Sequence, residues 1–90
     1  MAEKNIKHKL ADYLDIPKEI ILDYPLVSLI GNEEVAIQNH KGLIEYTDNV
    51  LRLKTALYPI RVDGKNFVIQ KITNEYVKIS GIIVNIAYEV

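Results

Sequence analysis

Residues 60–69, Ile60-Arg61-Val62-Asp63-Gly64-Lys65-Asn66-Phe67-Val68-Ile69, carry the clearest structural signal in the chain. Asp-Gly is a preferred pair in two-residue type I′ turns, where both central residues need positive φ. The residues on either side are rich in β-branched and aromatic types, which favour strands. This segment therefore predicts a β-hairpin with its turn at Asp63-Gly64, and an antiparallel sheet around it.

Similar short strands and turns continue on both sides of that segment. From Leu26 onward, 18 of 65 residues are Ile or Val, which suit strands. Turn signals separate runs of strand length, at Gly31-Asn32, His40-Lys41-Gly42, Asp48-Asn49, Asp63-Gly64 and Asn74-Glu75. The pattern predicts a mainly β protein, an antiparallel β-meander folded into a sandwich or roll. A short β-solenoid, which also has a period of about 20 residues, is the alternative fold.

The first 25 residues differ from the rest and carry helix signals. Ile6, Leu10, Tyr13 and Leu14 fall on one helical face, and Pro17 ends that helix. A second short helix is expected over Lys18–Leu22. No Gly/Ser/Pro-rich linker follows, so we expect one domain over residues 1–90, with a helical arm at 1–25 and a β domain at 26–90.

Composition excludes several classes of function. The chain has 90 residues, 11 basic and 12 acidic, with no cysteine. A net charge of −1 provides no basic field for nucleic acid, and the lack of cysteine removes thiolate metal sites and disulfides. No secretory signal and no run of about 18 apolar residues is found, which predicts a cytoplasmic protein.

No residue pattern predicts catalysis. The two histidines, His8 and His40, have no partners at metal-ligand spacing, and His40 is expected to be a turn residue. Ser28 and Ser80 fall inside expected strands, where no tight turn would present a nucleophile. We therefore expect no enzyme, with no catalytic residue, no metal, no cofactor and no small-molecule substrate.

Two segments are apolar on both faces, residues 26–30 and 82–88. Such strands are usually covered on both sides, here by the arm or by another subunit. An exposed apolar edge at the C-terminus would pair with another chain. Val84 and Ile86 are therefore candidate interaction residues, and a homo-oligomer built by edge-strand pairing is one possible role. A second is a peripheral membrane adaptor that uses the basic residues Lys4, Lys7, His8 and Lys9.

The order of turns and strands resembles the YabP/YqfC family of sporulation proteins, and its YqfC branch in particular. The matching residues are Leu14-Asp15-Ile16-Pro17, Leu22-Asp23-Tyr24-Pro25, Leu29-Ile30-Gly31, Ile37-Gln38-Asn39-His40-Lys41-Gly42, Asp48, Leu51-Arg52-Leu53, Asp63-Gly64, Phe67-Val68-Ile69 and Ser80-Gly81-Ile82. The stretch Lys54–Pro59 departs from the family pattern because it lacks a glycine, so a longer loop or a continuous strand is expected there.

The resemblance implies a non-enzymatic protein of endospore-forming bacteria that acts in the mother cell during sporulation. It implies a larger membrane-embedded sporulation protein as partner, and a role in assembly or scaffolding at the forespore surface. Such a protein would be cytoplasmic, or peripheral at the forespore membrane. The family supplies no functional residues, and we select His40 and Arg52 as candidate recognition residues because they are polar motif positions expected to be exposed.

Overall fold

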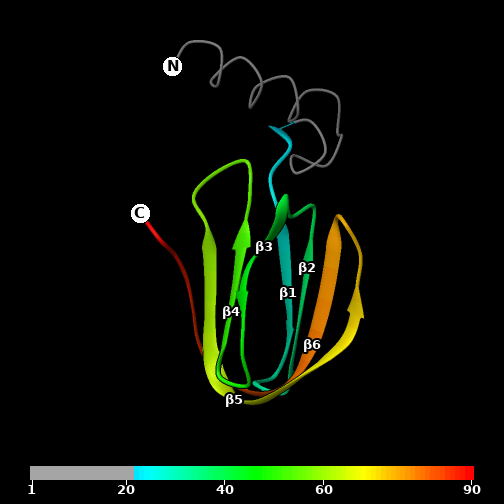
Figure 1. The fold of residues 1–90 in the computed structure, drawn as a ribbon, viewed down its shortest axis with the longest axis vertical. Coiled ribbons are helices and arrows are strands. Elements are labelled where there is room, and N and C mark those ends of the chain that lie inside the picture. Colours follow the sequence, from blue (N-terminus) through cyan, green and yellow to red (C-terminus); the bar gives the residue numbers. More distant parts are fainter. Residues whose placement is uncertain (1–21) are drawn as a thin grey trace.

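Six antiparallel strands make one sheet in the computed structural model, which describes residues 22–90. Their order across the sheet is β1-β2-β6-β5-β4-β3 (Figure 1). The strands are β1 (Leu26–Ile30), β2 (Glu34–Gln38), β3 (Gly42–Tyr46), β4 (Val50–Lys54), β5 (Ile60–Ile72) and β6 (Tyr76–Tyr88). Strands β3 to β6 follow one another as a meander, and the β1–β2 hairpin adds to the far side of β6.

The sheet folds over because β5 and β6 are long and bent. Each has 13 residues and contributes to both layers of the molecule (Figure 1). The second half of β5 and the first half of β6 lie with β2 and β1 in one layer. The first half of β5 and the second half of β6 lie with β4 and β3 in the other. The result is a two-layer β-sandwich made from a single sheet.

Glycines and β-bulges produce the bend. The pairing of β5 with β6 shifts register on both sides of Gly64 and Lys65. A side chain on Gly64 would collide with the carbonyl oxygen of Ile82 and the ring of Phe67, so only glycine fits. Gly81, on the other strand, has a φ of 143°, and a side chain there would approach the carbonyl oxygens of Lys65 and Asn66 too closely.

The turns of the two hairpins close over these bends. In the β3–β4 turn, the carbonyl oxygens of Asp48 and Asn49 accept hydrogen bonds from the N–H groups of Phe67 and Gly64. In the β1–β2 turn, the oxygens of Asn32 and Glu33 accept hydrogen bonds from the N–H groups of Ile83 and Gly81. Backbone groups that the bulges release from the ladder therefore find partners in a neighbouring turn.

The predicted hairpin at Asp63-Gly64 is wrong. Residues 60–72 form one continuous strand, and Asp63-Gly64 lies at its bend instead of in a turn. The physical reason is the burial of Phe67, which is 3% exposed and belongs to the core cluster. A tight turn at Asp63-Gly64 would pair Phe67 with Ile60, whereas the observed strand places it over the bend.

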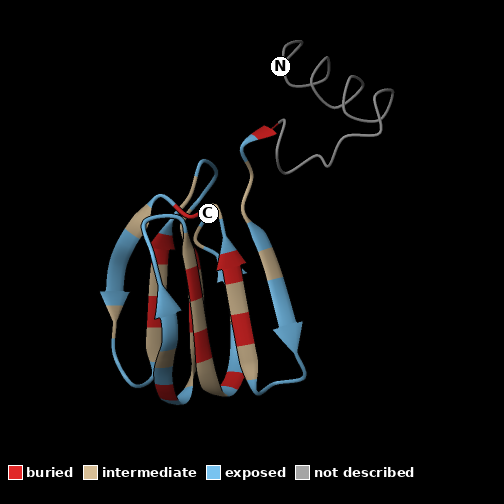
Figure 2. Ribbon diagram, turned by 90° about the vertical axis from the view of Figure 1, so that its right-hand side faces the viewer, coloured by how far each residue is buried: buried red, intermediate tan, exposed pale blue. Residues whose placement is uncertain are grey.

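Apolar side chains from β2, β4, β5 and β6 fill the space between the layers. Figure 2 shows the buried positions alternating with less buried ones along the strands. They alternate with outward residues along each strand, as a sandwich requires. The buried cluster contains Val35, Ile37, Leu51, Leu53, Ile60, Val62, Phe67, Val77, Ile79 and Ile83. The shorter outer strands β1 and β3 add no fully buried apolar residue to this cluster, so both remain at the margins of the core.

Threonine hydroxyls form hydrogen bonds with the backbone in three of the connections between strands. The hydroxyls of Thr47 and Thr73 each accept hydrogen bonds from two backbone N–H groups that follow them in the turn. Thr55 accepts one from Leu57 and donates one to the oxygen of Tyr58. The glycine-free stretch after Lys54 is therefore a loop, closed by Thr55 before β5 begins at Ile60.

The prediction of a mainly β, antiparallel fold is confirmed. Every strand pairing over residues 22–90 is antiparallel, which excludes the β-solenoid for this part of the chain. The helical arm predicted at 1–25 falls almost entirely outside the described residues, as do Lys4, Lys7, His8 and Lys9 of the predicted basic surface.

Candidate interaction surfaces

His40 lies in the β2–β3 connection but is not exposed as expected. Its side chain is 2% exposed. Nδ1 accepts a hydrogen bond of 3.1 Å from the N–H of Gly42, so the proton sits on Nε2, which donates to the oxygen of Thr73 at 3.1 Å. The preceding residue, Asn39, has the positive φ of 64° that this turn needs. His40 therefore fastens the β2–β3 connection to the β5–β6 turn.

Arg52 lies on the outer face of β4 and is half-buried. Its Nε donates to Glu89 at 2.9 Å, and its Nη1 lies 3.4 Å from a carboxylate oxygen of Glu45. The hydrogen bond to Glu89 raises the pKa of Arg52 above its ordinary value, with a smaller contribution from Glu45. Arg52 therefore ties the end of β6 to the face of β3 and β4, and its charge is compensated within the chain.

Val84 and Ile86 have different surroundings although both lie in the second half of β6. Val84 is 67% exposed and has no partner in the ladder, because Asp63 pairs with Asn85 and Gly64 with Ile83. Ile86 pairs with Val62 and packs against the core, half-buried. Val84 is thus a surface residue and Ile86 a core-margin residue. The described residues leave part of 82–88 exposed, and the arm that was expected to cover this segment lies almost entirely outside them.

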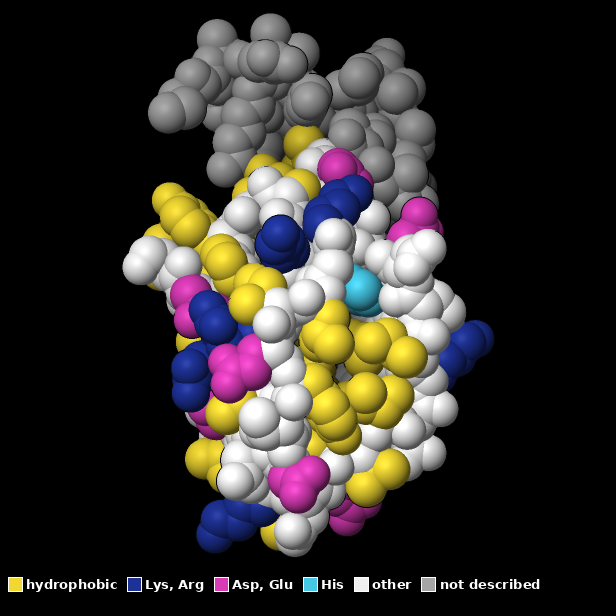
Figure 3. Space-filling model, viewed as in Figure 1, with side chains coloured by type: hydrophobic (Ala, Val, Ile, Leu, Met, Phe, Trp, Pro, Cys, Tyr) yellow, Lys and Arg dark blue, Asp and Glu magenta, His cyan; other side chains and the backbone are white. Residues whose placement is uncertain are grey.

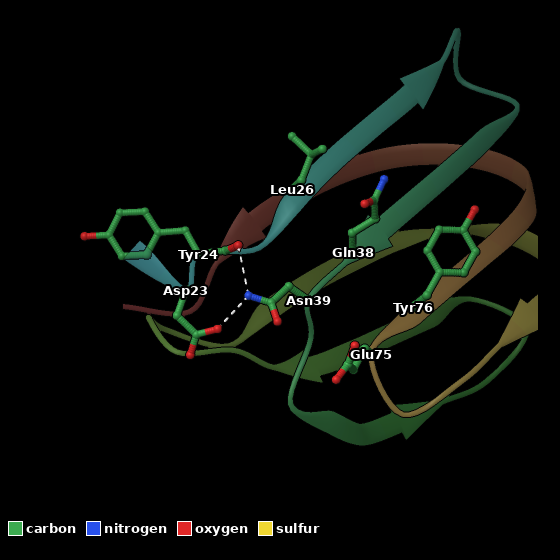
Figure 4. Close-up of a pocket in the computed structure, with 7 residues that line it drawn as sticks. All are labelled: Asp23, Tyr24, Leu26, Gln38, Asn39, Glu75 and Tyr76. Atoms are coloured by element: carbon green, nitrogen blue, oxygen red, sulfur yellow. Dashed lines mark hydrogen bonds between the residues drawn. The ribbon is translucent and has the colours of Figure 1, made fainter. Parts of the chain in front are cut away.

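A polar cluster occupies the end of the sandwich where β1 begins (Figure 4). The Asp23 carboxylate accepts hydrogen bonds of 2.8 Å from Lys41 and from Asn39. These two bonds, that of Lys41 first, lower the pKa of Asp23 below its ordinary value. Beside them lies a depression of about 380 Å³, which is also lined by Tyr24, Glu75 and Tyr76. Asp23 has positive φ, so the cluster holds the chain in the bend that leads into β1.

An apolar groove lies next to His40, on the open side of the sandwich. Leu43 pairs with the buried Leu53, and Ile72 pairs with the buried Val77, so both point toward the interior. They are nevertheless 46% and 45% exposed, because β3 and the second half of β5 have no further strand beside them. Figure 3 shows hydrophobic side chains gathered directly below the histidine.

We call this feature the β3–β5 groove. It contains a cavity of about 410 Å³ lined by His40, Lys41, Gly42, Leu43, Ile72, Thr73 and Asn74. Sequence reasoning missed Leu43 and Ile72, because their exposure depends on which strands end up at an edge. The sequence feature that could have indicated them is that each is an apolar residue next to a predicted turn.

Within residues 22–90, no group of three or more His, Cys, Asp or Glu side chains is arranged to hold a metal ion. The same part of the chain contains no helix that is long and apolar enough to cross a membrane.

The comparisons with known proteins agree with the resemblance seen in the sequence. The model of the YabP family matches residues 24–90. A curated relative, described as the uncharacterised protein YqfC of Bacillus subtilis strain 168, is 31% identical over 86 residues, which cover 96% of this chain and 92% of that protein. No solved structure matches the chain. The family match covers the whole β-sandwich and the relative nearly the full length, and the chain therefore belongs to the YabP family.

Proposed function

We propose that this chain is a sporulation protein that acts by binding other proteins, in assembly or scaffolding at the forespore surface. Membership of the YabP family and the likeness to YqfC support the sporulation role. The observation that carries the mode of action is the open side of the sandwich. There, side chains that face the interior reach solvent in the β3–β5 groove.

The groove suits an extended segment of a partner protein. Its two walls are edge strands, whose unpaired backbone groups can extend the sheet by strand addition. Leu43 and Ile72, which line the groove, can contact alternate apolar side chains of an added strand. The family resemblance makes a larger membrane-embedded sporulation protein the first partner to test, with this chain peripheral at the forespore membrane on the mother-cell side.

Co-purification from sporulating cells tests this proposal. The tagged chain is compared with an Ile72→Glu variant, which places a charge in the groove, and with a Val68→Glu variant as matched control. Val68 lies on the outer face of the same half-strand, opposite Ser80, and is already exposed. We expect the membrane-embedded protein to co-purify with the wild type and with Val68→Glu, and to be lost with Ile72→Glu.

Equal recovery with both variants would show that the groove does not bind the partner. Failure to recover any sporulation protein with the wild-type chain would contradict the proposed function itself. Leu43→Glu, in β3 on the other side of the groove from Ile72, serves as a second groove variant. Circular dichroism spectra and unfolding midpoints establish that each variant is folded.

A further inference from the structure

The side of the sandwich between β1 and the second half of β6 carries no charge along its two edges. Residues 26–30 contain no Asp, Glu, Lys or Arg, and neither do residues 79–88. Leu29, Ile30, Ile82, Val84 and Tyr88 are all exposed there. We call residues 26–30 and 82–88 together the β1–β6 side.

These two edges lie close together although they belong to different layers. A cavity of about 290 Å³ is lined by Pro25 and Val27 from one layer and by Ile60, Ile86, Ala87 and Tyr88 from the other. The β1–β6 side is therefore one continuous surface. Its apolar edges are not separate strips on opposite faces of the molecule.

The backbone of β6 can accept a further strand on this side. The N–H of Glu89 donates to the oxygen of Pro59, toward β5. Because N–H groups alternate along an antiparallel strand, those of Ile86 and Tyr88 point to the opposite side, where no strand formed by residues 22–90 lies beside β6. The N–H of Ile83 is already bonded to Asn32, so the free part of the edge begins after it.

The opposite side of the sandwich shows how an edge is usually protected. There β3 carries Glu45 next to a bulge, and the second half of β5 carries Lys71. Charges and bulges on edge strands oppose pairing with another copy of the same chain. Charges of this kind are missing from residues 26–30 and 82–88, although β6 has a bulge at Val84, so the two sides of the molecule are not equivalent.

We propose that the β1–β6 side binds a second copy of this chain, with the second halves of the two β6 strands antiparallel across a two-fold axis at Ala87. In a two-fold contact, residues near the axis meet their own counterparts, so any charge there would meet an equal charge. The uncharged sequence Ile82-Ile83-Val84-Asn85-Ile86-Ala87-Tyr88 avoids this, and its high β-propensity favours strand pairing. The proposal deepens the proposed function, since it names one protein partner and leaves the β3–β5 groove free.

Single cysteines provide a direct test because the chain has none of its own. Asn85 and Ala87 point outward from β6, opposite Asp63 and Arg61. Facing residues of antiparallel strands have Cα atoms about 4.5–5.5 Å apart, within the range that a disulfide spans. We expect Ala87→Cys, which lies on the proposed axis, to form a disulfide-linked dimer under mild oxidation of the purified chain, and Asn85→Cys, which would face position 89 of the second copy, to form less of it. The control Val68→Cys, on the other edge of the sandwich, should stay monomeric.

A Tyr88→Lys substitution in the cysteine variant puts two like charges at diagonal positions across the axis, and should abolish the cross-link. Tyr88 is 42% exposed, so the protein should stay folded. Cross-linking at 87 no stronger than at 68 would overturn the proposal, as would a light-scattering mass that stays at one chain from low to high concentration. Both measurements use the purified chain alone. Their failure is therefore distinct from failure to co-purify a membrane-embedded partner.

Discussion

At the residue scale, His40 joins two connections that are 33 positions apart in the chain. The imidazole forms a hydrogen bond with the oxygen of Thr73 and another with the N–H of Gly42, two part-buried backbone groups. The backbone N–H of His40 adds a third link, to the oxygen of Glu75. These bonds hold together the end of the sandwich that borders the β3–β5 groove.

We expect His40→Ala to lower the free energy of unfolding by about 1–3 kcal/mol, because a buried side chain is removed and two part-buried backbone groups lose their partner. Urea denaturation measures the change. Asn74→Ala, at an exposed position of the adjacent turn, is the control and should stay within about 0.5 kcal/mol of wild type. A His40→Ala protein as stable as that control would show that the histidine does not hold the two connections together.

The Asp23 carboxylate predicts a dependence of stability on pH. Its pKa is lowered in the folded chain by the hydrogen bonds from Lys41 and Asn39. A lowered pKa means that the carboxylate stabilises the fold above its unfolded pKa of about 3.9, and that this stabilisation is lost as pH falls through the folded value. Asp23→Asn should therefore lower the melting temperature near neutral pH, and the difference should disappear in strong acid.

Thermal unfolding at low salt between neutral pH and strong acid tests this. In a Lys41→Met background, the Asp23→Asn substitution should have a smaller effect, because the first partner of the carboxylate has been removed. A difference between wild type and Asp23→Asn that does not change with pH would contradict the assignment.

At the scale of elements, the two long strands decide the fold, and each bends where a glycine meets a neighbouring turn. Composition and spacing were sufficient to predict short antiparallel strands and the turns at residues 31–32, 40–42, 48–49 and 74–75. They were insufficient at Asp63-Gly64, because a local turn preference cannot show that Phe67 is needed in the core. Gly64 is needed for close packing at the bend, although the pair Asp63-Gly64 is typical of a turn.

We expect Gly64→Ala to be strongly destabilising, by about 3 kcal/mol, since the new methyl group would meet the Ile82 oxygen and the Phe67 ring. Lys65→Ala, at the next and exposed position, should change the free energy of unfolding by less than about 0.5 kcal/mol. Urea denaturation of both variants compares them directly. If the two were equally stable, close packing at the bend would not require glycine.

At the scale of the whole molecule, the sandwich has two open sides of different character. The β3–β5 groove combines an apolar floor with nearby charges, whereas the β1–β6 side is uncharged along both edges. The apolar segments 26–30 and 82–88 could be recognised from sequence as unusual. That both lie at edges on one side could not, because it follows from the order β1-β2-β6-β5-β4-β3.

The positions of the strands and bulges also decide which of the candidate residues are exposed. Val84 is exposed because a bulge leaves it without a partner, and its apolar type already indicated a surface of interest. His40 and Arg52 were predicted to be exposed polar residues. In the structure His40 is buried, and Arg52 is paired with Glu45 and Glu89. A polar residue in a turn or strand does not reveal which distant backbone or carboxylate it will meet.

Counting heat-resistant spores tests the central claim most directly. The gene in the spore-forming host is replaced by the Ile72→Glu variant or by its matched control, Val68→Glu, and cellular levels of each protein are measured alongside. If the chain works by binding a partner in the β3–β5 groove, Ile72→Glu should yield fewer heat-resistant spores, and Val68→Glu should sporulate as wild type does. Normal spore counts with Ile72→Glu present at the normal level would contradict a role for this groove in sporulation.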